Sequence, residues 1–348
     1  MDTVNTTSAA VCAERKTILH PNGQTTAYIH DTFTDPWRPS ETILIQHGFA
    51  RTADHFYHWV PALSRRYNVI RRDLRGHGSS SYPQPGEDYD YSTATILEEI
   101  KDTLDQLGVQ RVHFLGESTS GMLAEAFAAT YPDRVISVIV CSSPTHLPLA
   151  AQQFLALGMD SWPDACRKLG ARKWAERLAA SPGTLASTDP AYVKWWTDQI
   201  AVSNGHGLAG YAEFLCQLDS RPFLGKIQAP MLILAPTNSA VVTIESMREL
   251  AAKVPTARLQ LIESRGHEIY FEAAEACQSS ASRELKLGTL QEVTPDAKEL
   301  TFSRSALSLR IHGNSGQQQG AGTGGAEIDF AIQQWGDGKI LGNFVEFC

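Results

Sequence analysis

The chain has 348 residues, of which 43% are hydrophobic, with 30 basic and 38 acidic side chains and a net charge of −8. This acidic balance argues against the basic surface that nucleic acids and anionic membranes attract. No run approaches the roughly 18 apolar residues of a membrane span, and residues 1–5 lack the features of a signal peptide. We therefore expect a cytoplasmic protein of one large domain with additions, or of two domains, that binds neither nucleic acid nor membrane.

The first half of the chain alternates predicted strands with predicted helices. Residues 16–30 read as a hairpin, and strands are predicted at 42–46, 67–72, 111–115 and 135–141. The stretch 92–107 is typical of a helix, because its apolar residues recur at helical spacing. Strands that alternate with helices indicate an α/β protein with a mainly parallel sheet.

The strand pattern stops between residues 145 and 220. This segment is helical in character and rich in tryptophan, and we interpret it as a helical cap inserted over one edge of the sheet; a set of ordinary core helices is the alternative. Strands resume at 231–235 and 259–262.

Residues 116–121 (G-E-S-T-S-G) carry the strongest chemical signal. They follow the apolar run 112–115 and precede the helix-like stretch 122–129. A serine in a tight, Gly-flanked turn between a strand and a helix is typical of a nucleophile elbow, which exposes the Ser118 hydroxyl. The usual pattern is G-x-S-x-G, so Ser120 departs from it. An ordinary serine in a Gly-rich turn is the alternative.

Three motifs together resemble the α/β-hydrolase superfamily. They are H-G-F at 47–49, D-x-R-G-H-G-S at 73–79 and the elbow at 116–121, and the resemblance covers residues 15–277. Within the superfamily the chain looks most like the 3-oxoadipate enol-lactonase-like esterases and lactonases. The segments that suggest this branch are 56–60, 154–158 and 223–227.

The resemblance implies an α/β-hydrolase fold with helices on both faces of a central sheet and a helical cap. It also implies that Ser118 is the nucleophile and that the N–H groups of Phe49 and Thr119 form the oxyanion hole. His267, in a Gly-containing loop after the last strand, takes the place of the catalytic base.

The acid of the triad is missing from its expected place. The family has an aspartate a few residues after the strand at 231–235, where this chain has Asn238 and Ser239. Some members of the superfamily take the acid from the loop after the strand that follows the elbow helix. That loop, 141–144, also lacks a carboxylate. Glu245 is a weak candidate, better explained as a first-turn helix residue. Glu117 adjoins the nucleophile, but such neighbours usually point away.

Three explanations of the missing acid stay open. The Ser–His pair works with a polar residue that orients the histidine, an acid comes from elsewhere, or hydrolysis is weak or lost. Loss of the acid alone can cost on the order of 10⁴ in rate.

The function predicted from these residues is that of a serine hydrolase. Its substrate would be an ester, lactone or thioester of a small, partly apolar acyl compound. The alternative is a degenerate hydrolase fold, kept for binding or for a non-hydrolytic lyase or cyclisation step.

No cofactor or metal is expected. The six cysteines are scattered and lack a C-x-x-C pair, which favours reduced thiols over a disulfide framework. H-E-x-x-H and paired Cys/His spacings are absent from the sequence. Residues 320–325 match G-x-G-x-x-G, but no strand precedes them, so they do not indicate a nucleotide site.

The resemblance fades after residue 277. We expect 278–348 to be an irregular tail with a Gly/Gln-rich linker at 313–325, which adds little to the site. A disordered appendage, a small added unit and an artefact of gene prediction are all compatible with this composition. A chain that ends near residue 285 is expected to keep its activity.

Overall fold

The structure, a computed structural model, describes residues 14–84, 86–185 and 187–293. Most of the predicted tail, from residue 294 on, lies outside the described residues. The same holds for the predicted linker at 313–325 and the G-x-G-x-x-G match at 320–325.

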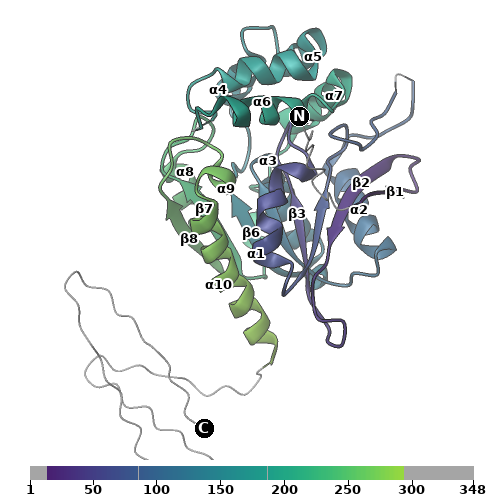
Figure 1. Cartoon of the computed structure of the whole chain (residues 1–348), viewed down its shortest axis with the longest axis vertical. Coiled ribbons are helices and arrows are strands. Elements are labelled where there is room, and N and C mark those ends of the chain that lie inside the picture. The colour runs from purple at the N-terminus through teal and green to yellow at the C-terminus, as the bar shows by residue number, and fades with distance from the viewer. Residues whose placement is uncertain (1–13, 85, 186, 294–348) are drawn as a thin grey trace, which may run out of the picture. The chain divides into compact units, whose positions relative to one another are not determined.

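A mainly parallel sheet forms the centre of the fold (Figure 1), which confirms the predicted fold class. Its order is β1-β2-β4-β3-β5-β6-β7-β8; only the β1–β2 and β2–β4 pairs are antiparallel. The eight strands found in the described residues are β1 (Arg15–Leu19), β2 (Thr25–Asp31), β3 (Thr42–Gln46), β4 (Asn68–Arg72), β5 (Val112–Glu117), β6 (Val135–Cys141), β7 (Met231–Pro236) and β8 (Ala257–Ile262).

Helices cover both faces of the sheet. Successive side chains of a strand point to opposite faces, and the buried strand residues accordingly divide between two apolar clusters. One cluster packs on α2 (Thr93–Gln106), α3 (Thr119–Thr130) and α8 (Ile244–Lys253). The other packs on the 3-10 helix η1 (Ala53–Trp59), α1 (Val60–Leu63), α9 (Ile269–Glu272) and α10 (Ala274–Val293). The short 3-10 helices η2 (Pro132–Arg134) and η3 (Leu224–Lys226) precede β6 and β7.

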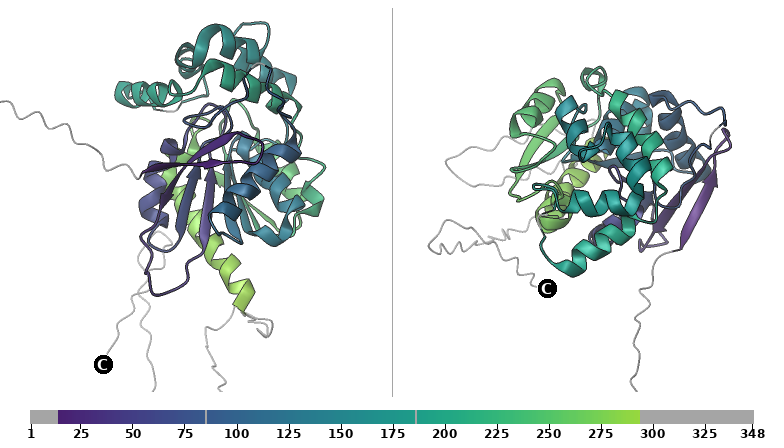
Figure 2. Two further views of the ribbon diagram at one scale, coloured as in Figure 1. Left: turned by 90° about the vertical axis from the view of Figure 1, so that its right-hand side faces the viewer. Right: turned by 90° about the horizontal axis from the view of Figure 1, so that it is seen from above.

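Four helices between β6 and β7 occupy the predicted cap segment. They are α4 (Leu149–Ala156), α5 (Trp162–Ala179), α6 (Pro190–Ile200) and α7 (Gly205–Gln217), and they lie over the sheet edge where the parallel strands end (Figures 1 and 2). At their base, the Ser220 N–H donates to the Thr145 carbonyl at 2.8 Å. His146 and Asp219 form an isolated β-bridge beside it. The two ends of the cap are therefore fastened together.

α10 continues beyond the boundary that the sequence predicts after residue 277. Cys277, Ala281 and Leu285 are buried on its inner side, against the apolar cluster of β3, β5, β6 and β7. The helix runs to Val293. The predicted boundary thus cuts the helix that closes this face of the sheet, because the small and polar residues of this stretch obscure its apolar side.

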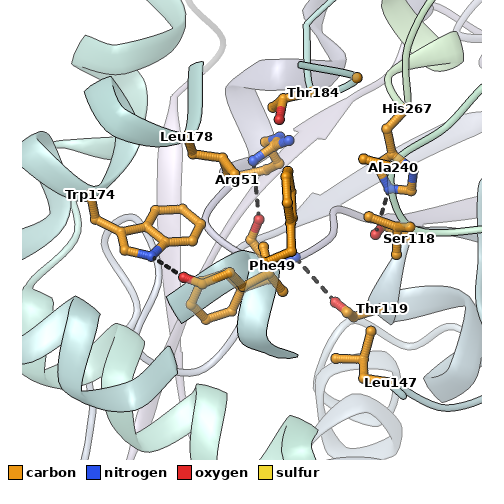
Figure 3. A pocket seen from close by; sticks show the side chains of 14 residues that line it. Phe49, Arg51, Ser118, Thr119, Leu147, Trp174, Leu178, Thr184, Ala240 and His267 are labelled. Carbon is orange, nitrogen blue, oxygen red and sulfur yellow. Dashed lines mark hydrogen bonds between the residues drawn. The ribbon is translucent and has the colours of Figure 1, made fainter. Parts of the chain in front are cut away.

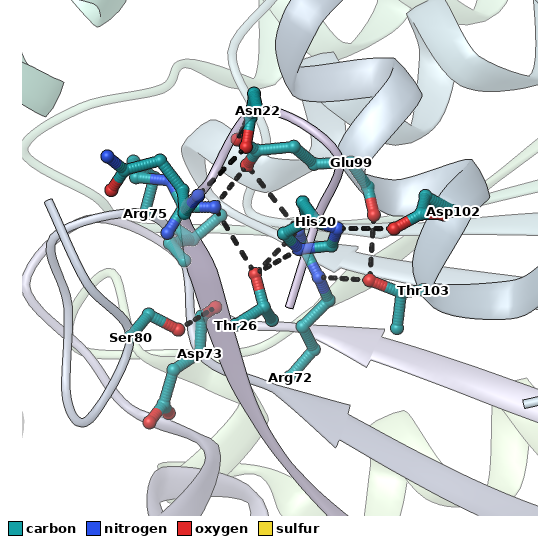
Figure 4. A network of polar contacts seen from close by, with 12 residues as sticks. His20, Asn22, Thr26, Arg72, Asp73, Arg75, Ser80, Glu99, Asp102 and Thr103 are labelled. Carbon is teal, nitrogen blue, oxygen red and sulfur yellow. Dashed lines mark hydrogen bonds and ion pairs between the residues drawn. The ribbon is translucent and has the colours of Figure 1, made fainter. Parts of the chain in front are cut away.

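A buried polar network joins the β1–β2 hairpin to α2 (Figure 4). Arg75 pairs with Glu99 at 2.7 Å, and Arg72 donates to Thr103 at 3.1 Å. Asp73 accepts the N–H groups of Ala53 and Ser79. The 73–79 motif therefore holds loops in place through its charged residues and takes no direct part in the site below.

Candidate active site

Ser118 lies at the sharp turn between β5 and α3. Its backbone has φ 51° and ψ −124°, a conformation that is uncommon for a residue with a side chain. Gly116 is required beside it, since a Cβ there would lie 2.3 Å from the Ser120 carbonyl oxygen. At Gly121 a Cβ would lie 2.1 Å from Ser143 Oγ. Strain of this kind often marks functional sites and here presents the Ser118 hydroxyl to the pocket.

Ser120, the residue that departs from the usual elbow pattern, has a structural contact. Its hydroxyl donates to the His47 carbonyl oxygen at 2.6 Å, and the side chain is fully buried. The elbow is thereby joined directly to the 47–49 loop, a bond that a glycine at this position would lack.

His267 meets Ser118 although 149 positions separate them. His267 Nε2 lies 2.9 Å from Ser118 Oγ. The histidine is in the loop after β8, and the Ser142 hydroxyl donates to its carbonyl oxygen at 2.8 Å. The predicted nucleophile and the predicted base are therefore within hydrogen-bond reach of each other (Figure 3).

A serine hydroxyl occupies the far side of the imidazole. Ser239 Oγ lies 2.9 Å from His267 Nδ1, while the Asn238 amide turns away and donates to the Arg265 carbonyl. Among the described residues, no carboxylate is within hydrogen-bond reach of either ring nitrogen. Glu245, the weak candidate from sequence, is exposed and lies 3.7 Å from Arg248, with which it pairs along α8. That candidate is wrong, because the Glu245 side chain points to solvent.

The missing carboxylate affects the charge of the imidazole. Burial, and to a smaller extent the nearby Arg51 cation, together lower the pKa of His267 to about 3. The ring is therefore neutral at neutral pH. An imidazolium, which forms when the ring accepts a proton, would lack a negative partner here.

The two predicted oxyanion donors lie beside Ser118. The Phe49 N–H donates to the Thr119 hydroxyl at 3.1 Å, so this amide has an acceptor within the protein (Figure 3). The Thr119 N–H belongs to the first turn of α3, where amides have no acceptor within the helix. Rotation of the Thr119 side chain would open the Phe49 amide to a ligand. Glu117 Oε2 accepts the Gly48 N–H at 2.6 Å and so fixes the loop.

A buried charged group behind the site was missed at the sequence level. Arg51 pairs with Glu268, and its guanidinium lies 4.6 Å from the ring centroid of Trp196, on cap helix α6. Glu268 also accepts from Trp196 Nε1 at 2.8 Å and from the Tyr192 hydroxyl at 2.9 Å. The only sequence signal was proximity, since Arg51 is two residues after Phe49 and Glu268 adjoins His267.

A pocket opens above Ser118 and His267. Apolar side chains form most of its wall, and α4 and α5 of the cap contribute several of them (Figure 3). The apolar lining residues are Phe49, Leu147, Phe154, Leu155, Trp174, Leu178 and Val241. Arg51, Thr119 and Thr184 add polar atoms. Such a pocket suits a small, partly apolar ligand with a few polar atoms.

Within the described part of the chain, no group of three or more His, Cys, Asp or Glu side chains is arranged to hold a metal ion. Cys141, Cys166, Cys216 and Cys277 are free thiols. No helix in the described ranges is long and apolar enough to cross a membrane.

Comparison with known proteins gives matches over the same region. A family model described as "alpha/beta hydrolase fold" matches residues 41–274. A Pseudomonas savastanoi protein assigned as the carbamate hydrolase RutD is 27% identical over 240 residues, 65% of this chain and 86% of that protein. The 3-oxoadipate enol-lactonase 2 of Acinetobacter baylyi is 25% identical over 244 residues, 69% and 86% of the two chains.

Solved structures share the fold. The enol-lactonase from Burkholderia xenovorans superposes with a TM-score of 0.66 at 22% identity, over 76% of this chain and 98% of that chain.

Proposed function

Because the chain belongs to the α/β hydrolase fold family, we propose that it is a serine hydrolase in which Ser118 and His267 perform the chemistry. The observation that carries this proposal is the 2.9 Å contact between Ser118 Oγ and His267 Nε2 at the base of an apolar pocket. A nucleophile within hydrogen-bond reach of its base is the arrangement that acyl transfer needs.

The reaction would proceed in two halves. Ser118 Oγ attacks the carbonyl carbon as its proton passes to His267 Nε2, and the N–H groups of Phe49 and Thr119 hold the oxygen that becomes negative. The bond to the leaving oxygen or sulfur then breaks, and that atom takes the proton from His267. Water attacks the acyl-enzyme in the same way and releases the acid and the free Ser118 hydroxyl.

We propose an ester, lactone or thioester of a small, partly apolar acyl compound as the substrate. The apolar pocket wall supports the acyl part of this proposal. Among the relatives, a carbamate hydrolase and an enol-lactonase are named for substrates with a carbonyl next to a leaving heteroatom.

The free thiols of Cys141, Cys166, Cys216 and Cys277 support a reducing compartment such as the cytoplasm.

A second candidate function is favoured by one observation. The acid position holds Ser239, so the imidazole lacks the negative partner that stabilises the imidazolium. A fold that has lost hydrolysis could still bind the same small molecules, or catalyse a lyase or cyclisation step with His267 as proton donor or acceptor.

Labelling with a fluorophosphonate probe separates the two candidates, because only an activated serine reacts. We expect the wild type to be labelled and to hydrolyse members of an ester and lactone panel, however slowly. Ser118→Ala should lose both properties, and Ser279→Ala, a change at an exposed position of α10, should lose neither. Ligand-induced thermal stabilisation without labelling or hydrolysis would support the binding function and overturn the hydrolase proposal.

A further inference from the structure

Ser239 has three polar neighbours around one oxygen. The backbone N–H of Val241 donates to Ser239 Oγ at 3.0 Å, and that of Val242 donates to it at 3.2 Å. His267 Nδ1 is the third neighbour, at 2.9 Å. Which group supplies the proton in this third contact decides the chemistry of the site.

A hydroxyl group has one proton to donate and two lone pairs to accept with. The two amides of Val241 and Val242 occupy both lone pairs of Ser239 Oγ, since an amide nitrogen can only donate. The hydroxyl proton therefore has to point to His267 Nδ1, which must be unprotonated to accept it. Among the described residues, no other acceptor for this proton is within hydrogen-bond distance.

The opposite arrangement leaves groups unsatisfied. If Nδ1 carried the proton, three donors would converge on Ser239 Oγ, and the hydroxyl proton would lack an acceptor. Unsatisfied polar hydrogens in a largely buried site cost free energy. A neutral imidazole carries one proton, so an unprotonated Nδ1 places that proton on Nε2, which faces Ser118.

We infer that Ser239 is a positioning residue that holds His267 in the Nε2–H tautomer, so that the resting site presents a proton donor to Ser118 and not a base. This inference rests on the proposed function and specifies where the imidazole proton of that site lies at rest. An imidazole with its proton on Nε2 cannot accept the Ser118 proton until the proton has moved to Nδ1. Holding a catalytic histidine in the wrong tautomer costs about 10⁴-fold in kcat.

An aspartate at position 239 would reverse this preference. A carboxylate only accepts, and its two oxygens could bind the Val241 and Val242 amides on one side and an Nδ1–H on the other. Nε2 would then be free to take the proton of Ser118. The serine thus changes the direction of one hydrogen bond without changing the position of the imidazole.

The first test reads the tautomer directly by NMR of protein labelled with ¹⁵N-histidine at neutral pH. The His267 signals are assigned by their absence from His267→Gln. We expect a protonated Nε2 in the wild type and in Ser239→Thr, which keeps the hydroxyl, and a protonated Nδ1 in Ser239→Asp. A wild-type spectrum with the proton on Nδ1 would overturn the inference, whatever the variants show.

The second test measures kcat/KM on the ester and lactone panel. We expect Ser239→Asp to raise it by about 10²- to 10⁴-fold, toward the cost of a wrong tautomer, while the control Ser279→Asp, at an exposed position of α10, stays within twofold of the wild type. Ser118→Ala in the Ser239→Asp background should remove the gain.

The two proposals fail in different ways. The expected tautomers without hydrolysis in any variant would support the inference about Ser239 and overturn the hydrolase function. If the wild type hydrolyses the panel and Ser239→Asp does so no faster, the inference about Ser239 is overturned and the proposed hydrolase function stands. If Ser239→Asp does not fold, the wild-type and Ser239→Thr spectra still decide the tautomer.

Discussion

The two halves of the candidate site are built with different tolerance for change. On the Ser118 side, close contacts exclude a Cβ at Gly48, Gly116 and Gly121, and the Ser120 hydroxyl joins the elbow to the 47–49 loop. On the His267 side, the imidazole is positioned through the Ser142 hydroxyl and Ser239 Oγ. The geometry on that side tolerates a hydroxyl where a carboxylate is expected, whereas our inference about Ser239 predicts that proton transfer becomes slower. A hydrolase fold can thus keep its site geometry while its chemistry changes.

The His267 side depends most strongly on the buried Arg51–Glu268 pair, and breaking it should have the largest effect. Arg51→Met leaves the Glu268 charge buried and unpaired, with an expected loss of about 3–5 kcal/mol in the free energy of unfolding. The double variant Arg51→Met/Glu268→Gln should recover most of this loss. Urea denaturation at pH 7 measures both.

An exposed pair provides the control. Arg65 pairs with Asp35 at 2.6 Å and is 64% exposed, so Arg65→Met should cost under about 1 kcal/mol. Equal losses for Arg51→Met and Arg65→Met would show that burial of the Arg51–Glu268 pair adds nothing.

The Ser118 side should break at Gly116. A Cβ at this position would lie 2.3 Å from the backbone oxygen of Ser120, and neither strand β5 nor the start of α3 can move freely. Gly116→Ala should therefore cost about 3 kcal/mol, the upper range for overpacking, and displace Ser118 from His267. Gly225→Ala is the matched control, since a Cβ there meets nothing within 4 Å. Similar thermal melts for the two variants would contradict the steric account of the elbow.

Much of this arrangement was predictable from sequence because it depends on local pattern. Apolar runs followed by Gly-rich turns predicted the parallel strands and the elbow. The resemblance to the α/β-hydrolase superfamily implied the place of His267, and superfamily membership is confirmed by the family match. Positions 238 and 239 were recognised as the place of a missing aspartate. The direction of the Ser239 hydrogen bond was not predictable, because it depends on two backbone amides whose orientation only the folded loop defines.

Contacts between the cap and the core were beyond the sequence for a related reason. Trp196 and Tyr192 reach Glu268 only once α6 has packed over the sheet edge. The end of α10 was also missed, since its buried Ala281 and Leu285 are separated by polar residues without a strong apolar pattern. Pairings across distant elements leave little trace in the local spacing of residues.

Helix α3 connects the Ser118 side to the cap through a buried acid, and its titration offers a pH test. Burial raises the pKa of Glu125, and the hydrogen bond from the Ser220 hydroxyl offsets part of this rise. The resulting pKa is about 8. The unfolded chain loses this proton near its ordinary pKa of about 4.3. Between these values the folded state holds the extra proton, so stability falls as the pH rises from about 4.5 to 8.

Glu125→Gln should therefore stabilise the protein by about 2 kcal/mol at pH 6, with the gain vanishing near pH 4.5. Urea midpoints across this range measure the difference. Glu245→Gln, at an exposed position on α8, should follow the wild-type curve throughout. If the Glu125→Gln and wild-type curves ran parallel, Glu125 would have the same pKa in both states.

The smallest expected effect concerns Ser120, where the chain departs from the usual elbow sequence. Its hydroxyl donates to the buried His47 carbonyl oxygen at 2.6 Å, and a buried acceptor left without its donor costs about 1–2 kcal/mol. Ser120→Ala should lose that amount. Ser120→Gly restores G-x-S-x-G but should lose slightly more, since glycine in a helix costs up to about 1 kcal/mol relative to alanine. Greater stability of Ser120→Gly than of the wild type, in urea denaturation, would show that the bond between the elbow and the 47–49 loop contributes nothing. The expected order of stability is wild type, then Ser120→Ala, then Ser120→Gly. This order would mean that each side of the site relies on one serine hydroxyl. The Ser120 hydroxyl on the Ser118 side contributes stability, whereas the Ser239 hydroxyl on the His267 side sets the position of a proton.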